Sequence, residues 1–217
     1  MLDIFTSSVN QGRSFALVNK VLEQKEKSHL FITLELNESE VLKRMRRLNT
    51  VKFKHNIEDV NCVVKMFTSN ILINDLVEFI KKEEHKYDSI LIDQSYLVQT
   101  NLKGDDVTYS DTIREVTGIY SDLSNKIQKP VSITFNLGRS FFNTDSYDKL
   151  TEARMSLIKG TKNIDEFIKG NFNIINIFKR ENKVHMLQYP YKKAEVVIDL
   201  DLYSQGHKSY NDEEVFG

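Results

Sequence analysis

Short apolar runs alternate along this chain with longer segments in which apolar residues recur every three or four positions. The first apolar run is Leu2–Thr6 and the second is Leu30–Leu34. Between them, Ser14–Lys27 carries most of its apolar residues on one side, as an amphipathic helix does. This order predicts a strand, a helix and a second strand.

The same alternation continues through the middle of the chain. Asn37–Glu40 is a helix start signal and precedes a segment with helical apolar spacing. The continuous apolar run Ser89–Asp93 indicates a strand covered on both faces, and Pro130 is expected to end a long helix. We therefore expect strands at Val63–Phe67, Ser89–Asp93 and Val131–Phe135, and helices at Asn74–Lys82 and Asp111–Lys129.

The last part of the chain has a different pattern. Three apolar runs, Ile174–Phe178, Lys183–Gln188 and Glu195–Leu200, are separated by short joins, which is typical of antiparallel strands at one edge of a sheet. The expected fold is α/β, with a mostly parallel twisted sheet that is flanked by helices and has antiparallel strands at its C-terminal edge. We expect this domain to span residues 1–203, and residues 204–217 to form a flexible polar tail.

Composition narrows the classes of partner. The 217 residues are 40% hydrophobic and 28% charged, which suits one domain with a proper core. The net charge of -1 gives no general attraction to nucleic acid, so the basic run Lys43–Arg47 is either a local contact or a solvated helix face. Cys62 is the only cysteine, which excludes an intrachain disulfide, and we expect it to be a small core residue. No signal peptide or membrane-spanning stretch is evident, so we expect no membrane association and a cytoplasmic location.

The first strand leads directly into a candidate phosphate-binding loop. Backbone N–H groups and a helix N-terminus meet an anion at such a place, and the usual pattern is G-x-x-x-x-G-K-[ST]. Gly12 and Ser14 match it, whereas Ser7 replaces the first glycine and Arg13 the lysine. A turn capped by Ser14 would give the same letters. The whole candidate loop is Ser7, Ser8, Val9, Asn10, Gln11, Gly12, Arg13 and Ser14.

Polar residues also follow three other predicted strands. Glu35 closes the second strand, Asp93 closes Ser89–Asp93, and Asn136 and Arg139 follow Val131–Phe135. The carboxyl ends of parallel strands meet at one edge of a sheet, where ligands bind. Asp93 is therefore a candidate for organising Mg²⁺, and Asn136 for sensing a γ-phosphate. Glu35 and Asp93 as simple caps of the next segments remain the alternative.

Taken together, these motifs resemble the RecA-like motor domain of DnaB-type replicative helicases, including phage versions, over roughly residues 2–200. The segments that carry the likeness are Thr33–Leu36, Ile90–Asp93, Tyr96–Leu97, Phe135–Arg139 and Ser156–Thr161. The resemblance implies a RecA-like P-loop NTPase fold that binds ATP and Mg²⁺. It implies Glu35 as the catalytic glutamate, Ser14 and Asp93 at the metal, and Asn136 and Arg139 near the γ-phosphate.

Departures from that family limit the expected activity. Arginine is longer and planar where lysine is a compact charge, so Arg13 predicts weakened hydrolysis with binding retained. Asn136 is one methylene shorter than the family's glutamine, and the late Lys-x-Arg of the family has only Lys192 and Lys193 in its place. Because the first strand begins at Leu2, we expect no N-terminal helix of the kind that docks helicase subunits into rings.

Two functions from different classes stay open. One is an ATP-binding, helicase-type domain in DNA replication or recombination, with single-stranded DNA, replication or helicase proteins, or further copies of the chain as partners. For it, Arg139–Lys149 is a candidate DNA groove, although a buried aromatic pair is the alternative. The other function is a catalytically inactive RecA-like module that binds or regulates a helicase or replication complex. A recombinase-like or circadian-clock-like relative of the same superfamily is a third interpretation.

Overall fold

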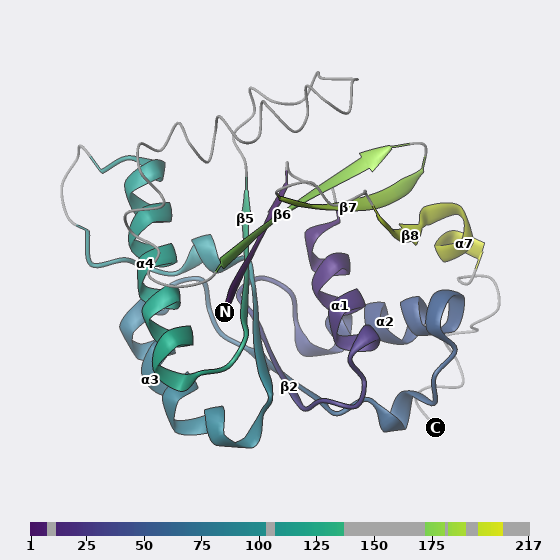
Figure 1. The fold of residues 1–217 in the computed structure, drawn as a ribbon, viewed down its shortest axis with the longest axis horizontal. Helices are drawn as coiled ribbons and strands as arrows, with labels where there is room; N and C mark the ends of the chain where they lie inside the picture. The colour runs from purple at the N-terminus through teal and green to yellow at the C-terminus, as the bar shows by residue number, and fades with distance from the viewer. Residues whose placement is uncertain (8–11, 103–106, 137–171, 181, 190–194, 206–217) are drawn as a thin grey trace.

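Eight strands form one sheet in the order β3-β2-β4-β5-β1-β6-β7-β8. The computed structural model describes residues 1–7, 12–102, 107–136, 172–180, 182–189 and 195–205. The strands from β3 to β6 in that order are parallel, and β7 and β8 each run antiparallel to the strand before (Figure 1). The strands are β1 (Leu2–Ser7), β2 (His29–Thr33), β3 (Cys62–Met66), β4 (Ser89–Asp93), β5 (Val131–Asn136), β6 (Phe172–Arg180), β7 (Lys183–Tyr189) and β8 (Glu195–Asp199).

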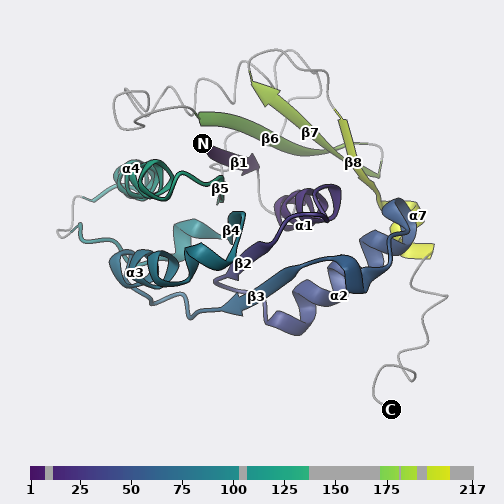
Figure 2. The same ribbon diagram turned by 60° about the horizontal axis from the view of Figure 1, so that its bottom comes forward.

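Helices cover both faces of this sheet. Helices α1 and α2 lie on one face and α3 and α4 on the other (Figure 2). The chain crosses the first face as it moves from β1 to β2 and β3, and it returns over the opposite face to β4 and β5. Changing face with direction keeps every crossover right-handed, as twisted strands require. The helices are α1 (Arg13–Glu23), α2 (Glu38–Leu48), α3 (Ile73–Glu83), α4 (Tyr109–Ile127) and α7 (Leu200–Gln205), with short turns at Asn49–Phe53, Ile57–Asp59, Glu84–Lys86 and Ser95–Leu97.

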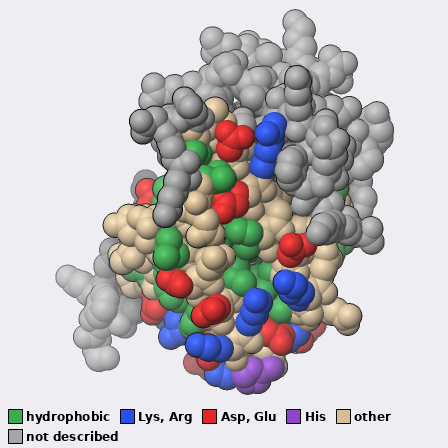
Figure 3. All heavy atoms as spheres, turned by 90° about the vertical axis from the view of Figure 1, so that its left-hand side faces the viewer, with side chains coloured by type: hydrophobic (Ala, Val, Ile, Leu, Met, Phe, Trp, Pro, Cys, Tyr) green, Lys and Arg blue, Asp and Glu red, His purple; other side chains and the backbone are tan. Residues whose placement is uncertain are grey.

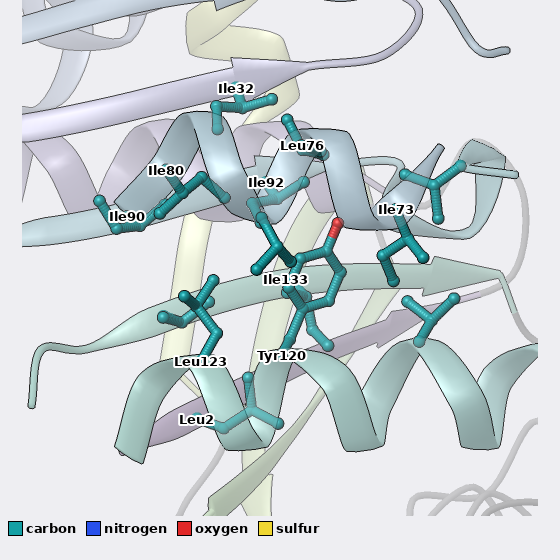
Figure 4. Packing of buried hydrophobic residues seen from close by; sticks show 14 of the residues in the cluster. Leu2, Ile32, Ile73, Leu76, Ile80, Ile90, Ile92, Tyr120, Leu123 and Ile133 are labelled. Carbon is teal, nitrogen blue, oxygen red and sulfur yellow. The ribbon is translucent and has the colours of Figure 1, made fainter. Parts of the chain in front are cut away.

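The core has two halves because successive strand residues point to opposite faces of the sheet. Ile90 and Ile92 pack toward α3 and α4, whereas Leu91 packs toward α1 and α2, and all three are fully buried. On the α3 and α4 side, the Tyr120 ring lies beside Ile92 and Ile133 in a fully apolar environment (Figure 4). Burying one such side chain stabilises the fold by about 1.5–3 kcal/mol. The expected α/β fold with a mostly parallel sheet is therefore confirmed.

Strand β6 differs from the expected antiparallel meander. It pairs in parallel with β1, with Ile174 beside Ile4, and it extends two residues beyond the predicted run at each end. Antiparallel pairing begins only between β6 and β7, where Ile177 lies opposite Met186. The apolar pattern gives the strand but cannot give its direction, because β1 is far away in the sequence.

Helix ends also differ by a few residues. The first helix ends at Glu23 rather than at Lys27, because Gln24 leaves the helical conformation (φ -117°, ψ 42°). The long helix begins earlier, at Tyr109, where Thr108 and Asp111 form a reciprocal capping box. It ends at Ile127 because Gln128 is left-handed (φ 55°), two residues before Pro130.

Cys62 and the basic run lie at the surface of the structure rather than in its centre. Cys62 begins β3 and is partly exposed, so it packs at the margin of the α1 and α2 cluster and not inside the core as expected. In the basic run, Arg44 pairs with Glu40 at 2.8 Å, and Arg47 lies over the Tyr203 ring at 4.8 Å. These two arginines already serve the fold, whereas Lys43, in the same run, is exposed.

The face that α3 and α4 cover carries acidic and basic side chains intermingled with apolar ones (Figure 3). Exposed acidic residues such as Asp75 and Glu78 lie on α3 close to the lysines Lys81 and Lys82. Such mixing gives this side no strong field of one sign. None of the helices in the described part of the chain is long and apolar enough to cross a bilayer.

Candidate phosphate and magnesium site

Gly12 forms the hinge between the first loop and α1. It is the N-cap of α1 and is left-handed, with φ 93°. A Cβ at this position would also come within 2.9 Å of the Val184 methyl groups on β7. Both the dihedral angle and the close approach therefore require glycine. The helix begins at once, with the Ala16 N–H donating to the Gly12 carbonyl at 3.0 Å.

Ser14 and Asp93 meet although 79 positions separate them in the sequence. The Ser14 hydroxyl, in the first turn of α1, donates to Asp93 Oδ2 at 2.6 Å. Asp93 ends β4, and its side chain is almost fully buried (1% exposed). The N-terminal turn of α1, with its outward-pointing N–H groups and positive dipole end, therefore lies beside a buried carboxyl group and a hydroxyl group.

Thr134 on β5 holds the other oxygen of the same carboxyl group. Its hydroxyl donates to Asp93 Oδ1 at 3.1 Å and accepts from the Gln94 N–H at 2.6 Å. Gln94 is left-handed (φ 60°), which turns the chain sharply after β4. Ser95 then donates to the Thr134 carbonyl at 2.6 Å. Two neighbouring strands and the following turn thus fix the carboxyl group in one orientation.

Burial sets the ionisation of Asp93. Desolvation raises the pKa of this carboxyl group, because the charged form loses water without a direct ion pair. The hydrogen bonds from Ser14 and Thr134 act in the opposite direction, as do the charges of Arg13 and Arg44. A divalent cation beside Asp93 would favour the ionised form and remove that penalty.

Arg13 lies over an aromatic ring at the edge of this site. Its Cζ atom is 5.6 Å from the centroid of the Tyr96 ring, a geometry in which the ring face attracts the cation. The Tyr96 hydroxyl donates to Gln94 Oε1 at 2.5 Å. The Arg13 Nη1 atom is buried and has no hydrogen-bond partner within the described residues. Arg13 therefore has donor capacity left for an anion.

The other residues singled out in the sequence are placed less fully. Glu35 lies two residues beyond the end of β2 rather than closing it, and its side chain is exposed. Its strand neighbours β4, with Thr33 beside Asp93. Asn136 is the last residue of β5 and pairs in register with Ser7 at the end of β1. The backbone thus brings the ends of β1, β2, β4 and β5 to one edge of the sheet. Ser8–Gln11, Arg139, Lys192, Lys193 and the segment Arg139–Lys149 lie outside the described residues.

Three contributors escaped the sequence analysis as site residues, namely Thr134, Gln94 and the ring of Tyr96. A signal for Thr134 was available, because it alternates with the apolar Ile133 and Phe135 and so must face α1. No comparable signal exists for Gln94, whose left-handed turn leaves no mark in the sequence.

The residue set fits magnesium better than a tightly bound transition metal. The described residues contain no cluster of three or more His, Cys, Asp or Glu side chains that would hold an ion by themselves. Mg²⁺ keeps several waters and commonly takes only one or two protein oxygens in addition to substrate phosphates. The hydroxyl of Ser14 and the carboxyl group of Asp93 match that requirement.

Comparisons with known proteins support the same architecture. No family model and no curated protein sequence matches the chain. Among solved structures, the ATPase domain of a DnaB-type helicase matches with a TM-score of 0.67 and 10% identity, over 90% of this chain and 78% of that chain.

Two further solved structures extend this picture. A DnaB-like replicative helicase, whose structure also describes its interactions with primase, gives a TM-score of 0.65 at 10% identity over 90% of this chain and 54% of that one. A KaiC-like protein from the hyperthermophilic archaeon Pyrococcus horikoshii OT3 gives 0.51 at 13% identity over 90% and 81%. The chain therefore has the RecA-like P-loop fold found in the ATPase domains of DnaB-type helicases.

Proposed function

We propose that this chain is a RecA-like domain that binds ATP with Mg²⁺ and acts in DNA replication or recombination. The observation that carries the proposal is the 2.6 Å hydrogen bond between Ser14 and Asp93, formed where α1 begins after β1. Hydroxyl and carboxyl groups at this position, beside a helix N-terminus, are what a Mg²⁺-nucleotide requires. The likeness to DnaB-type ATPase domains supports the class of ligand.

In this proposal each residue has one task. Backbone N–H groups of the Ser7–Ser14 loop and the Arg13 guanidinium bind phosphate oxygens. Ser14 and Asp93 hold Mg²⁺, which supplies charge neutralisation at the phosphates when it is bound. Glu35 orients and deprotonates the attacking water, and its exposed position beyond β2 suits contact with a bound ligand. Asn136 and Arg139 contact the γ-phosphate.

Hydrolysis is expected to be weaker than in domains with a P-loop lysine. A guanidinium is planar and forked, so its donors reach a phosphate at a different distance and angle from those of an ammonium. The contact of Arg13 with Tyr96 further constrains where its charge can lie. Binding depends on total charge and is retained, whereas turnover depends on placement at the transition state.

Calorimetry with Mg²⁺-ATP on the purified chain tests the binding step. We expect binding by the wild type and a loss of about 10- to 100-fold in affinity for Asp93→Asn, because a ligand to the metal shell is removed. Asp75→Asn on the exposed side of α3 is the matched control and leaves affinity unchanged. Absence of binding by the wild type at millimolar Mg²⁺-ATP would sink the proposal.

Hydrolysis is followed in parallel on the same protein. Turnover that disappears in Glu35→Gln but persists in Glu38→Gln, an exposed glutamate on α2, would identify an ATPase with Glu35 as its base. Binding without turnover in the wild type would favour a catalytically inactive module that binds or regulates a helicase or replication complex. Adding single-stranded DNA as a second ligand then tests the link to replication: it should bind or alter turnover.

A further inference from the structure

We infer that Tyr96 is the positioning residue of the phosphate loop, and that it works as a matched pair with Arg13. The inference rests on the proposed function and deepens it, because it names the residue that orients the loop's cation. The ring of Tyr96 holds the guanidinium, and the rest of the site holds the ring.

The ring cannot move independently of the carboxyl group at the metal position. Tyr96 donates to the Gln94 side chain at 2.5 Å, and the Gln94 N–H donates to Thr134 Oγ1 at 2.6 Å. The same Thr134 hydroxyl donates to Asp93 Oδ1 at 3.1 Å. The ring, the turn after β4 and Asp93 therefore form one hydrogen-bonded unit, and Arg13 lies against the ring of that unit.

The pair accounts for the arginine in the loop. A planar guanidinium stacks on an aromatic ring and keeps its edge donors free, whereas a lysine ammonium is a strongly hydrated point charge that gains less from such a surface. With one face on Tyr96, Arg13 loses conformational freedom before any ligand arrives. Its buried Nη1 atom, which has no partner among the described residues, is the donor left for a phosphate oxygen.

This arrangement makes a pairwise claim about positions 13 and 96. Removing the ring should weaken the phosphate contact only when an arginine is there to be positioned. A lysine at position 13 should be indifferent to the residue at position 96. A general structural role for Tyr96 would instead lower affinity by the same factor with either cation.

A double-mutant cycle on Mg²⁺-ATP affinity tests the claim, with Arg13→Lys, Tyr96→Leu and the double variant measured by calorimetry. We expect Tyr96→Leu alone to weaken binding by about five- to tenfold, the range for a partly desolvated cation–π contact. In the Arg13→Lys background the same change should alter affinity by less than about twofold. Tyr96→Phe should restore most of the affinity, because it keeps the ring.

Phe53→Leu is the matched control, because Lys52 lies over the Phe53 ring at 5.0 Å in a contact away from the candidate site, and it should leave affinity unchanged. Urea unfolding of each variant ensures that only folded protein is compared. Equal losses in both backgrounds, or no loss in either, would overturn the inference while leaving the proposed function intact. Failure of the wild type to bind Mg²⁺-ATP would instead refute the proposed function itself.

Discussion

Two buried carboxyl groups lie beneath α1, toward opposite ends of the helix, and their surroundings differ. Asp3 on β1 forms an ion pair with Lys20 of α1 and accepts from Asn173 Nδ2 at 2.7 Å. Lys20 also donates to Ser132 at 2.8 Å, which satisfies a second donor. Asp93 receives only two hydroxyl groups, those of Ser14 and Thr134, although it is just as deeply buried.

The difference separates a structural charge from a functional one. At the Lys20 end, negative and positive charges meet within the fold, so the group needs nothing further. At the Ser14 end, the negative charge has no cation in direct contact among the described residues, and desolvation raises the pKa of Asp93. A buried group left in that condition is suited to a charge that arrives from outside. Similar burial therefore has opposite meanings at the two ends of one helix.

The largest effect is expected at the structural end. Lys20→Met removes the cation and leaves Asp3 buried with an uncompensated charge, which should lower the free energy of unfolding by about 3–5 kcal/mol. Urea unfolding measures this loss. The double variant Asp3→Asn with Lys20→Met should recover much of it, because no charge is then left buried. A loss below about 1 kcal/mol for Lys20→Met would place Asp3 in a wetter environment than its 4% exposure indicates.

A pair of serine substitutions compares the two ends directly. Ser14→Ala leaves Asp93 Oδ2 without its donor and should cost about 1–3 kcal/mol. Ser132→Ala removes a hydroxyl from a carboxyl group that is still paired with Lys20 and should cost about 0.5–1.5 kcal/mol. Only Ser14→Ala should also weaken the Mg²⁺ dependence of ATP binding, measured by calorimetry with and without the metal. Equal effects of both variants on that dependence would erase the proposed difference.

Asp93→Asn should change stability less than Ser14→Ala, but its effect should depend on pH. A buried carboxyl group with a raised pKa stays protonated in the folded state at pH values at which the unfolded chain has already lost the proton. Its contribution is thus complete below the unfolded pKa of about 4 and is lost as the pH rises through the folded pKa. Asparagine cannot ionise and escapes this loss.

Urea unfolding of wild type and Asp93→Asn at several pH values between 4 and 7 reveals the effect. The stability difference should move in favour of the variant as the pH rises. Asp75→Asn, which alters an exposed carboxyl group on α3, should show no such trend. A constant difference across the range would contradict a raised pKa at Asp93.

The smallest effect is expected on the opposite face of the sheet. The Tyr120 hydroxyl is buried among apolar residues and has no hydrogen-bond partner in the described part of the chain, and desolvation raises its pKa. Tyr120→Phe removes that hydroxyl and should leave stability unchanged or raise it by up to about 1 kcal/mol. Thermal unfolding measures the change. A loss above 1 kcal/mol would instead reveal a partner for the hydroxyl, so that this face too would hold a satisfied polar group.

Much of the fold was predictable because strands and helices leave period-specific apolar patterns. The run Ser89–Asp93 coincides with β4, and Asn37 caps α2 by accepting from the Glu40 N–H, as its position suggested. The pattern fails where geometry is decided by a distant partner. The end of α1 at Glu23 is an example, because His29 contacts the Gln24 carbonyl at 2.9 Å and the chain must turn back there to begin β2.

The candidate site was predictable only as a set of strand ends. The sequence placed Ser14 and Asp93 at the same edge of a parallel sheet, and the structure joins them by a hydrogen bond. It could not indicate that Thr134 holds the second oxygen of Asp93, because hydroxyl residues on strands are common and mostly structural. Nor could it foresee the stacking of Arg13 on Tyr96, since side-chain contacts across a turn depend on the left-handed Gln94.

The close approach of Gly12 to Val184 ties the start of α1 to the β6–β7 hairpin. Positions 12 and 184 share a single small volume, so a larger residue at one can be accepted only if the other shrinks. Val184→Ala would open that space, yet Gly12→Ala would still suffer from its dihedral angle, so the glycine is constrained twice and the valine once. Among descendants of this chain, position 184 should therefore drift toward smaller residues far more readily than position 12 can change at all.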